Sequence, residues 1–474
     1  MLSYTPIQEI PAIHARLVDT FAAGITRPLA WRREQLQQLV RMFQDNKTAI
    51  EHALWLDLRK PDQESALMEI AGIVGNAGLA LANLEQWTAP VKPPVGSDHS
   101  NWNPVIHQVP KGVILLISPW NYPFTLTFKP FIGAIAAGCP AVLKPSEVSA
   151  NCAALMDELV PKYLDSNAYA VVNGGVSETT ALLDLRWDHI FYTGGVAVGR
   201  IVAAAAAKFV TPTTLELGGK SPVIVDAGYD LDLAAKRILF GKAQNSGQLC
   251  VSPDYTVVMR SVYPEFLEAL KRTYKTFWPS GALAPGTKWG KIVNEHHAQR
   301  LLKLLNTTKG RILLGGKHEK LEDGTRIEPT IVTDVGLDDP LMQDEIFGPI
   351  HPIIVVDSID EAIQIIRSFP KTLTVYAFTN SEETKQKLLD RTDSGTLQFN
   401  DTVSMLGADD IPFGGRGDSG YGAWHGWWSF KTFSQERTQI DVPASEEPYF
   451  AARYYPYTQE KYEIMSSLCY PPTS

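Results

Sequence analysis

The sequence predicts an α/β protein with a doubly wound parallel sheet, and two observations carry this prediction. Short β-branched runs alternate with helical stretches from residue 113 onward, and a glycine-rich turn joins one of these runs to a helix. Apolar strands that alternate with helices are typical of a parallel sheet covered on both faces, which binds ligands at the carboxyl ends of its strands. We therefore expect a nucleotide-binding domain of this kind, followed by a second α/β domain.

The composition is that of an ordinary globular protein. The chain has 474 residues, of which 45% are hydrophobic and 20% are charged. At roughly 150 residues per domain, this length allows two or three domains. The net charge is −9, and neither sign forms a long block. A nucleic-acid partner is not expected, because its binding surface would be clustered and basic.

The first hundred residues predict a helical scaffold that ends in a linker. Apolar side chains recur at helical spacing in residues 33–43 and again in residues 48–56. Residues 88–96 then contain three prolines. Prolines in such close succession exclude a helix and favour an extended connection.

The strands expected in the first sheet are residues 113–117, 141–143, 170–172 and 189–192. The last of these runs directly into Thr193, Gly194, Gly195 and Gly199, and an alanine-rich helix follows. Glycines at a strand-to-helix turn allow backbone N–H groups to approach a diphosphate closely. The spacing is not that of the GxGxxG fingerprint, so a plain tight turn explains these residues equally well.

The same alternation restarts after residue 219 and predicts the second α/β domain. Its first elements are a strand at 223–226, a helix at 231–240, a strand at 256–259 and a helix at 264–277. The tail after Asp441 has several tyrosines and prolines but no long apolar run. We expect it to lie draped over the surface or over a partner subunit.

The cysteines and the apolar runs indicate where the protein resides. The four cysteines show neither paired spacing nor metal-ligand spacing, which favours a reducing, cytoplasmic compartment and no metal site. The N-terminus has the pattern of neither a secretory signal nor a transit peptide. Residues 128–142 are the longest candidate for a membrane span, but they contain a lysine and two prolines and fall short of the ~20 residues required. A buried helix and strand are expected there, and no membrane span.

One cysteine, Cys250, is a candidate nucleophile. It follows Gly247, Gln248 and Leu249 directly after a helical run. A thiolate beside a nicotinamide can add to an aldehyde carbon and leave the hydrogen ready to depart as hydride. Taken alone, Cys250 is explained at least as well as a small buried core residue.

A series of short motifs favours the interpretation of Cys250 as a nucleophile over that of a core residue. They occur in order at residues 119–123, 144–147, 192–195, 216–220, 247–250, 345–349 and 412–415. Together they resemble the NAD(P)-dependent aldehyde dehydrogenase superfamily. The short N-terminal region, the form of residues 144–147 and the tail at 453–457 are most similar to the class 3 and fatty-aldehyde branch in its fungal form.

The resemblance implies a role for each matching residue. Cys250 would be the nucleophile, Asn121 would donate its amide to the oxyanion with the Cys250 backbone N–H, and Glu216 would activate water. From the residues alone, Asn121 is equally a turn residue, and Glu216 equally an ion-pair member or a cap. Lys144 and Glu147 would bind the adenosine ribose, where a carboxylate favours NAD, although NADP remains possible. The cofactor residues implied are Ser118, Trp120, Lys144, Glu147, Thr193, Gly194, Gly195, Gly199, Glu345 and Phe347.

The resemblance also implies an architecture and an activity. It places a Rossmann-like NAD-binding domain at 1–96 and 112–215 and a catalytic domain at 216–400. Bridging strands for a homodimer are expected at 97–111 and 425–447, and a tail at 448–474. The implied enzyme is an oxidoreductase that oxidises an apolar aliphatic or aromatic aldehyde to the acid through a thioester on Cys250.

Departures from the family pattern leave the substrate open. Leu249 stands where the family usually has a small or hydroxyl-bearing residue before the cysteine, and Gly195 stands where serine or asparagine is common. Residues 402–410 lack the histidine usual in the class 3 branch. This segment, with Asp409 and Asp410, is expected near the substrate mouth. Two alternatives are a catalytically idle structural or binding member, and an acylating dehydrogenase that passes the thioester to coenzyme A. Intact catalytic residues argue against the first alternative, and the presence of Glu216 argues against the second.

Overall fold

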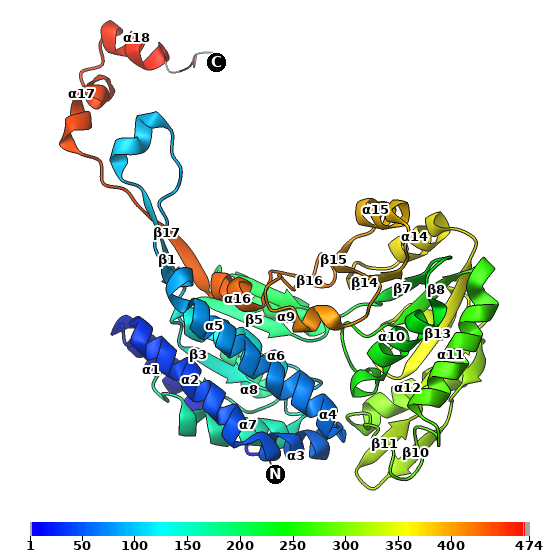
Figure 1. Ribbon diagram of the computed structural model, residues 1–474. Coiled ribbons are helices and arrows are strands. Elements are labelled where there is room, and N and C mark those ends of the chain that lie inside the picture. The colour runs from blue at the N-terminus through cyan, green and yellow to red at the C-terminus, as the bar shows by residue number, and fades with distance from the viewer. Residues whose placement is uncertain (1, 468, 470–474) are drawn as a thin grey trace.

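The computed structural model describes residues 2–467 and 469, which form two lobes and a projecting arm (Figure 1). The first lobe contains a six-stranded sheet in the described part of the chain. Its strands, in spatial order, are β16 (Gly420–Tyr421), β6 (Thr213–Glu216), β5 (His189–Thr193), β2 (Ile114–Ile117), β3 (Ala141–Lys144) and β4 (Tyr169–Val171). All neighbours are parallel except β16, which is antiparallel to β6.

Helices cover this sheet on both faces, as the apolar character of its strands requires. The central strands β2 and β3 are buried along their whole length. The helices are α1 (Ile10–Ala22), α2 (Leu29–Asp45), α3 (Lys47–Leu58), α5 (Gly72–Thr88), α6 (Pro123–Ala137), α7 (Ala150–Tyr163), α8 (Val176–Leu183), α9 (Val196–Ala207) and α16 (Gly426–Phe433).

The second lobe repeats the arrangement with a seven-stranded sheet. Its strands, in spatial order, are β15 (Ser394–Phe399), β14 (Thr372–Phe378), β7 (Pro222–Val225), β8 (Tyr255–Met259), β13 (Ile350–Val356), β12 (Thr330–Thr333) and β9 (Arg311–Leu314), of which only β9 is antiparallel to its neighbour. Its helices are α10 (Leu231–Ala243), α11 (Tyr263–Phe277), α12 (Glu295–Thr307), α13 (Pro340–Gln343), α14 (Ile359–Arg367) and α15 (Glu382–Arg391), beside a hairpin of β10 (His318–Leu321) and β11 (Gly324–Ile327).

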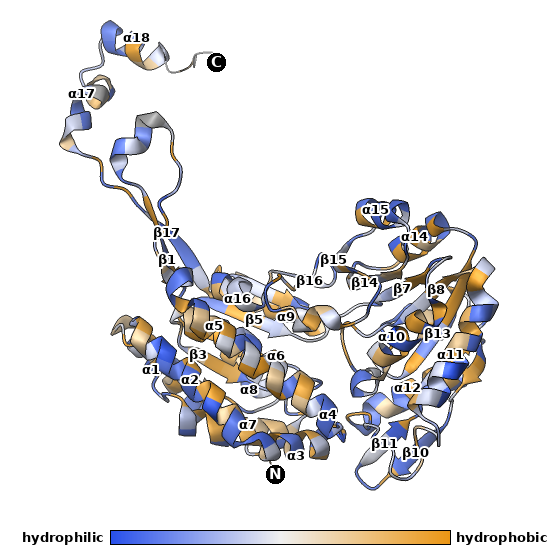
Figure 2. Ribbon diagram, viewed as in Figure 1, coloured by the Kyte–Doolittle hydropathy of each residue, from blue (hydrophilic) through white to orange (hydrophobic). Residues whose placement is uncertain are grey.

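These two sheets confirm the predicted α/β fold class. Figure 2 shows the contrast on which the prediction rested, with strand β13 coloured as hydrophobic and the surface helix α15 mainly as hydrophilic. The first sheet takes its strands from residues 114–216 and 420–421, and the second takes its strands from residues 222–399. The division of the chain into domains at residue 216 stays a prediction.

The arm is a two-stranded ribbon of β1 (Val105–Pro110) and β17 (Ser434–Gln439), paired antiparallel. Both strands lie within the stretches 97–111 and 425–447 given to bridging strands, near residues 105–109 and after Phe430, where a hairpin and a late strand were expected. Residues 426–433 form helix α16, because Trp427, Phe430 and Phe433 lie at helical spacing and pack against the first lobe. The strand begins where these apolar residues end.

The tail was expected to lie over the surface of its own subunit or over a partner subunit. It does not lie over either lobe of its own subunit, so the first of these expectations is wrong. Helices α17 (Glu447–Phe450) and α18 (Gln459–Ser467) lie at the tip of the arm, away from both lobes (Figure 1). They sit near the short helix η3 (Ser97–Trp102), and the backbone N–H of Asp441 donates to the Trp102 carbonyl at 2.8 Å. Its large side chains Tyr455, Tyr457, Tyr462, Ile464 and Met465 stay exposed at the tip of the arm.

The helical stretch long enough to cross a membrane is not the run that the sequence singled out. Residues 128–142 form the end of α6 and strand β3, as expected. Among the described residues, one continuous helical stretch, Asp62–Thr88, is long and apolar enough to cross a membrane by length and composition. It comprises α4 (Asp62–Glu64), the π-helical turn η2 (Ser65–Ala71) and α5, and it packs against α2 and α6. A core helix passes the same test, so a single such stretch is weak evidence for a membrane span.

Candidate active site

Cys250 lies between two cavities. The first has a volume of about 640 Å³ and is lined by Cys250, Asn121 and Glu216, with residues from the carboxyl ends of the first sheet. The second has a volume of about 440 Å³ and a largely apolar lining. Only Cys250 and Leu126 line both. A group bound in one cavity and a group bound in the other would therefore meet at the Cys250 thiol.

A strained turn presents this thiol. Helix α10 ends at Ala243, and Asn245, Ser246 and Gly247 then follow with φ values of 49°, 55° and 75°. Consecutive left-handed residues are costly unless they are held in place, and they concentrate at functional sites. At Gly247 glycine is required, since an added Cβ would lie 2.2 Å from the carbonyl oxygen of Gly348. The turn directs Cys250 away from the helix axis and into the cavities.

The Cys250 thiol is half-buried and resists ionisation. Burial raises its pKa well above 9.0, and the Glu345 and Glu216 carboxylates raise it further. The backbone N–H groups of Cys250 and Val251 oppose this rise. The thiol is therefore neutral near pH 7 in the resting protein, and it must lose its proton as it reacts.

Asn121 lies in the loop between β2 and α6 and is 2% exposed. Its side-chain amide donates to the Gln248 carbonyl at 3.1 Å. Its backbone carbonyl accepts hydrogen bonds from Lys60 Nζ at 3.0 Å and from Asn245 Nδ2 at 2.9 Å. The amide thus lies on the first cavity, next to the turn that carries Cys250.

Glu216 ends strand β6 and is 3% exposed. Within the described residues, neither of its carboxylate oxygens has a hydrogen-bond partner. Burial raises its pKa well above 4.5; the Trp424 indole and the Gly415 backbone N–H oppose the rise without reaching hydrogen-bond geometry. An unpartnered buried carboxyl beside a nucleophile is suited to accept a proton.

The first cavity also collects six of the predicted cofactor residues. Its walls include Trp120, Thr193, Gly194, Gly195, Glu345 and Phe347. Gly195 caps helix α9, and a Cβ added there would meet nothing within 4 Å. The backbone at this helix N-terminus therefore faces open space, which fits a diphosphate. Burial and the nearby Asp254 raise the pKa of Glu345 to about 8.

Four predicted cofactor residues do not line this cavity. Lys144 and Glu147 form an ion pair of 3.2 Å at the carboxyl end of β3. The Ser118 backbone N–H donates to the Lys144 carbonyl at 3.0 Å, so all three lie at the same edge of the sheet. Gly199 allows close packing instead, because an added Cβ would lie 2.7 Å from the Leu217 side chain.

The second cavity contains the loop expected at the substrate mouth. Val403, Leu406, Gly407 and Asp409 line it, and Asp409 pairs with Lys129 at 2.9 Å. A histidine also faces this cavity, although it comes from the start of α16 and not from residues 402–410. This residue, His425, is buried, and burial together with Lys129 lowers its pKa to about 3, so it is neutral.

Several residues of the site had no signal in the sequence analysis. Lys60 and Glu69 are remote from every motif, and His425 and Trp424 follow an unremarkable loop. Gln248 belongs to the motif at 247–250, whereas closeness to the cysteine was the only signal for Asn245. Gln248 fixes the turn, because its amide donates to the Asn245 carbonyl at 2.9 Å and to the Lys291 carbonyl at 3.1 Å.

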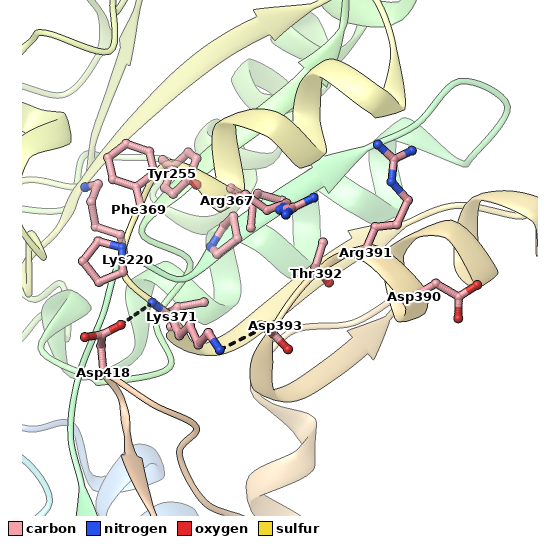
Figure 3. Close-up of a pocket in the computed structure, with 14 residues that line it drawn as sticks. Lys220, Tyr255, Arg367, Phe369, Lys371, Asp390, Arg391, Thr392, Asp393 and Asp418 are labelled. Carbon is pink, nitrogen blue, oxygen red and sulfur yellow. Dashed lines mark hydrogen bonds and ion pairs between the residues drawn. The ribbon is translucent and has the colours of Figure 1, made fainter.

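A third cavity, of about 490 Å³, lies at the amino ends of β7, β8 and β14 (Figure 3). Charged groups line it, and several of them form ion pairs with each other or with residues nearby. Lys371 Nζ pairs with Asp393 at 3.1 Å, and its backbone N–H donates to Asp418 at 3.1 Å, as Figure 3 shows. It contains none of the predicted site residues.

All four cysteines are free thiols. Among the residues that the structure describes, no group of three or more His, Cys, Asp or Glu side chains is arranged to hold a metal ion.

Comparisons with known proteins agree with this geometry. The sequence profile of the "Aldehyde dehydrogenase family" matches residues 15–439. "Aldehyde dehydrogenase, dimeric NADP-preferring" of Mus musculus is 44% identical over 451 residues, which cover 95% of this chain and 98% of that protein. "Aldehyde dehydrogenase family 3 member I1, chloroplastic" of Arabidopsis thaliana is 42% identical over 97% of this chain and 84% of its own length. The solved structure "Substrate bound state of Staphylococcus Aureus AldH" has a TM-score of 0.92 and 37% identity, and it covers 97% of this chain and 99% of that chain.

Proposed function

The chain belongs to the aldehyde dehydrogenase family, and from this premise we propose which of its residues carry the reaction. The protein is an NAD(P)-dependent enzyme that oxidises an aldehyde to a carboxylic acid. One observation supports the assignment of residues above all others. Cys250 lies on the walls of both cavities, beside the Asn121 amide and the unpartnered carboxyl of Glu216.

The reaction begins at the thiol. The Cys250 sulfur forms a bond to the carbonyl carbon, its proton passes to solvent, and the carbonyl π electrons move onto oxygen. The resulting oxyanion takes hydrogen bonds from the Asn121 amide and the Cys250 backbone N–H, and such a donor is typically worth a factor of roughly 10²–10³. When bound in the first cavity, the oxidised nicotinamide supplies the acceptor for the hydride, and Cys250 then carries a thioester.

Glu216 serves the second half of the reaction. It takes a proton from water as the water oxygen attacks the thioester carbon, and the C–S bond then breaks. The carboxylic acid leaves and the thiol is restored. Its buried position keeps the carboxylate free of competing partners in the described structure. A water-activating base makes transfer of the acyl group to coenzyme A the less favoured outcome.

An apolar aliphatic or aromatic aldehyde is the proposed substrate class. The second cavity is lined by side chains such as Leu67, Met68, Phe240, Phe413 and Trp424. Burial of apolar surface there stabilises a bound hydrocarbon chain or ring by about 25 cal/mol per Å². The main charged side chains of this lining are Lys129 and Asp409, and their opposite charges cancel in an ion pair.

Both NAD and NADP are proposed as cofactors, with NAD preferred. The Glu147 carboxylate would repel a 2′-phosphate on the ribose. Its ion pair with Lys144 offsets part of that charge, which leaves NADP admissible. The mouse and rat relatives are named NADP-preferring, which supports use of the phosphorylated cofactor.

A homodimer is the proposed assembly. The mouse and rat relatives are named dimeric. The arm of β1 and β17 projects from the first lobe as a two-stranded ribbon, and a second subunit would cover its exposed side chains.

Replacement of Cys250 by Ser tests the central assignment. We expect Cys250→Ser to abolish NADH formation with benzaldehyde and hexanal, because a serine hydroxyl is far less ionised than a thiol. Cofactor affinity, followed by quenching of tryptophan fluorescence, should stay within about two-fold of the wild type. A loss of cofactor affinity as large as the loss of turnover would show that Cys250 is structural.

A further inference from the structure

An ion pair with no role in the steps above lies directly behind the active site. Lys60 and Glu69 contact each other through Nζ and Oε1, and both side chains are 0% exposed. Lys60 follows helix α3, and Glu69 projects from the π-helical turn η2. Burial raises the pKa of Glu69, and the Lys60 ammonium opposes this rise.

Lys60 is directed at the residue proposed as oxyanion donor. Its ammonium group donates to the backbone carbonyl of Asn121 at 3.0 Å and lies 3.8 Å from the ring centroid of Tyr122. Asn245, in the strained turn before Cys250, donates to the same carbonyl at 2.9 Å. Two buried donors, one of them charged, therefore hold one backbone oxygen.

Glu69 holds the other end of the same loop. Its Oε2 accepts a hydrogen bond from the Thr125 backbone N–H at 3.0 Å. The Thr125 hydroxyl in turn donates to the carbonyl of Met68, which precedes Glu69. The ion pair thus fixes the backbone at residue 121 and at residue 125, and the oxyanion donor lies at the first of these two points.

The π-helical turn makes this geometry possible. In η2, Glu69 is buried toward Lys60, while Leu67, Met68 and Ala71 line the second cavity. Short π-helical segments are rare and occur frequently at functional sites. The same turn therefore forms a wall of the substrate cavity and anchors the loop that carries Asn121.

Stability alone does not account for a fully buried ion pair. Desolvation of the two charges offsets most of their attraction, and well-packed apolar replacements are often neutral or stabilising. The ion pair can instead matter through the position of the groups that it holds. A misplacement of about 1 Å in a catalytic group can cost on the order of 10²-fold in rate.

We propose that the Lys60–Glu69 ion pair is the positioning element of the oxyanion site: it holds the backbone of residues 121–125 so that the Asn121 amide meets the substrate oxygen. This role rests on the proposed function of Asn121. Lys60 and Glu69 act through Asn121 and do not touch the substrate.

The test replaces both charges together. In Lys60→Met/Glu69→Leu no unpaired charge stays buried, so the chain is expected to fold. We expect kcat and kcat/KM to fall together by roughly 10- to 100-fold, since an interaction of the transition state is lost, with cofactor affinity within about two-fold of the wild type. Leu39→Ala, in the core of α2, is the stability control: it should lower the melting temperature without this loss of kcat.

A double-mutant cycle with Asn121→Ala separates positioning from general damage. If the ion pair acts through the Asn121 side chain, its replacement should change kcat by less than about two-fold once that side chain is absent. The proposal would be overturned if replacing the ion pair lowered kcat by the same factor with and without the Asn121 side chain. It would also be overturned if Lys60→Met/Glu69→Leu had the kcat of the wild type. Should the double variant fail to fold, Glu69→Gln takes its place in the same cycle, with the same two outcomes.

Hydrogen exchange gives a readout that needs no turnover. The Thr125 amide, which donates to Glu69, should exchange at least about ten-fold faster in the double variant, while amides in helix α15 of the second lobe keep their rates. If the Thr125 amide exchanges at the wild-type rate in the double variant, the Lys60–Glu69 pair does not hold this loop, and the proposal is overturned. A wild-type protein that oxidises no aldehyde would instead overturn the proposed function, and the exchange experiment would still decide whether the pair holds the loop.

Discussion

The proposed role of the Glu216 carboxyl as a general base predicts the kinetics of a Glu216→Gln variant. A general base typically contributes a factor of ~10²–10⁴, so Glu216→Gln should slow steady-state turnover by that order. Hydride departs before the water attacks, so rapid mixing of this variant with NAD and a good aldehyde should give a burst of NADH near one equivalent per site. A nearly flat phase should follow, because the thioester on Cys250 is no longer hydrolysed.

Two results would contradict this assignment in different ways. If the burst disappears while cofactor still binds, Glu216 acts earlier and removes the thiol proton. If steady-state turnover is normal, Glu216 is not a base in this enzyme.

The raised pKa of the Cys250 thiol predicts an alkaline pH dependence. Thiolate is the reacting form, and its fraction grows with pH as long as the pH stays below the pKa. Because burial and the Glu345 and Glu216 carboxylates raise that pKa, kcat/KM should rise steadily from about pH 6 to about pH 9. Initial rates across this range check the prediction. A plateau already near neutral pH would show that the free enzyme holds the thiol ionised.

Cys250, Asn121 and Glu216 could be proposed from sequence because each belongs to a short motif with a definite chemical role. Lys60 and Glu69 could not, since a lysine and a glutamate nine residues apart normally indicate solvated charge, and only the π-helical turn places both inside. His425 was missed for a related reason. It approaches the second cavity from a helix start far along the chain from residues 402–410.

The turn from Asn245 to Gly247 yields a prediction about a single element. Gly247→Ala adds a Cβ at φ 75°, where it would lie 2.2 Å from the Gly348 carbonyl oxygen. We expect activity to fall at least about ten-fold as the Cys250 turn shifts, together with a lower melting temperature. Steady-state assays and thermal unfolding measure the two effects.

Gly228→Ala is the matched control for that variant. Gly228 has φ 83°, but an added Cβ meets nothing within 4 Å. The Gly228→Ala variant therefore has the same backbone strain at positive φ but no clash of the added Cβ. Residue 228 lies after β7, away from Cys250. Equal loss of activity in both variants would mean that strain in the fold, and not displacement of the nucleophile, explains the effect.

The central elements followed from sequence because their patterns are strong. The runs at 113–117 and 189–192 correspond to β2 and β5 within one residue at either end. The π-helical turn was not predicted, because no side-chain periodicity distinguishes residues 65–71 from an ordinary helix. The arm and its tip were not predicted as a projection either, since no local sequence pattern sets the direction in which a two-stranded ribbon leaves a lobe.

The arm is the least self-sufficient part of the molecule. A two-stranded ribbon is marginally stable at best in water. Its surroundings expose apolar side chains, with Val91 and Ile440 each 52% exposed and Val442 43% exposed. Val91 pairs with Ile106 of β1, and η3 and the tail lie at the tip of the arm (Figure 1). A second copy of the chain is the partner that would bury these groups in both subunits at once.

Light scattering at micromolar concentration should therefore report a mass near twice that of the chain. Ile440→Asp combined with Val442→Asp places two charges where apolar contact is expected, so the dimer should dissociate at concentrations at which the wild type stays associated. Val210→Asp changes a still more exposed valine on the first lobe, at 89% exposure, and should leave the mass unchanged. A monomeric wild type would remove the basis for the proposed dimer. A wild-type dimer that survives the double substitution would place the interface away from the arm, and the exposed ribbon would then need a different partner.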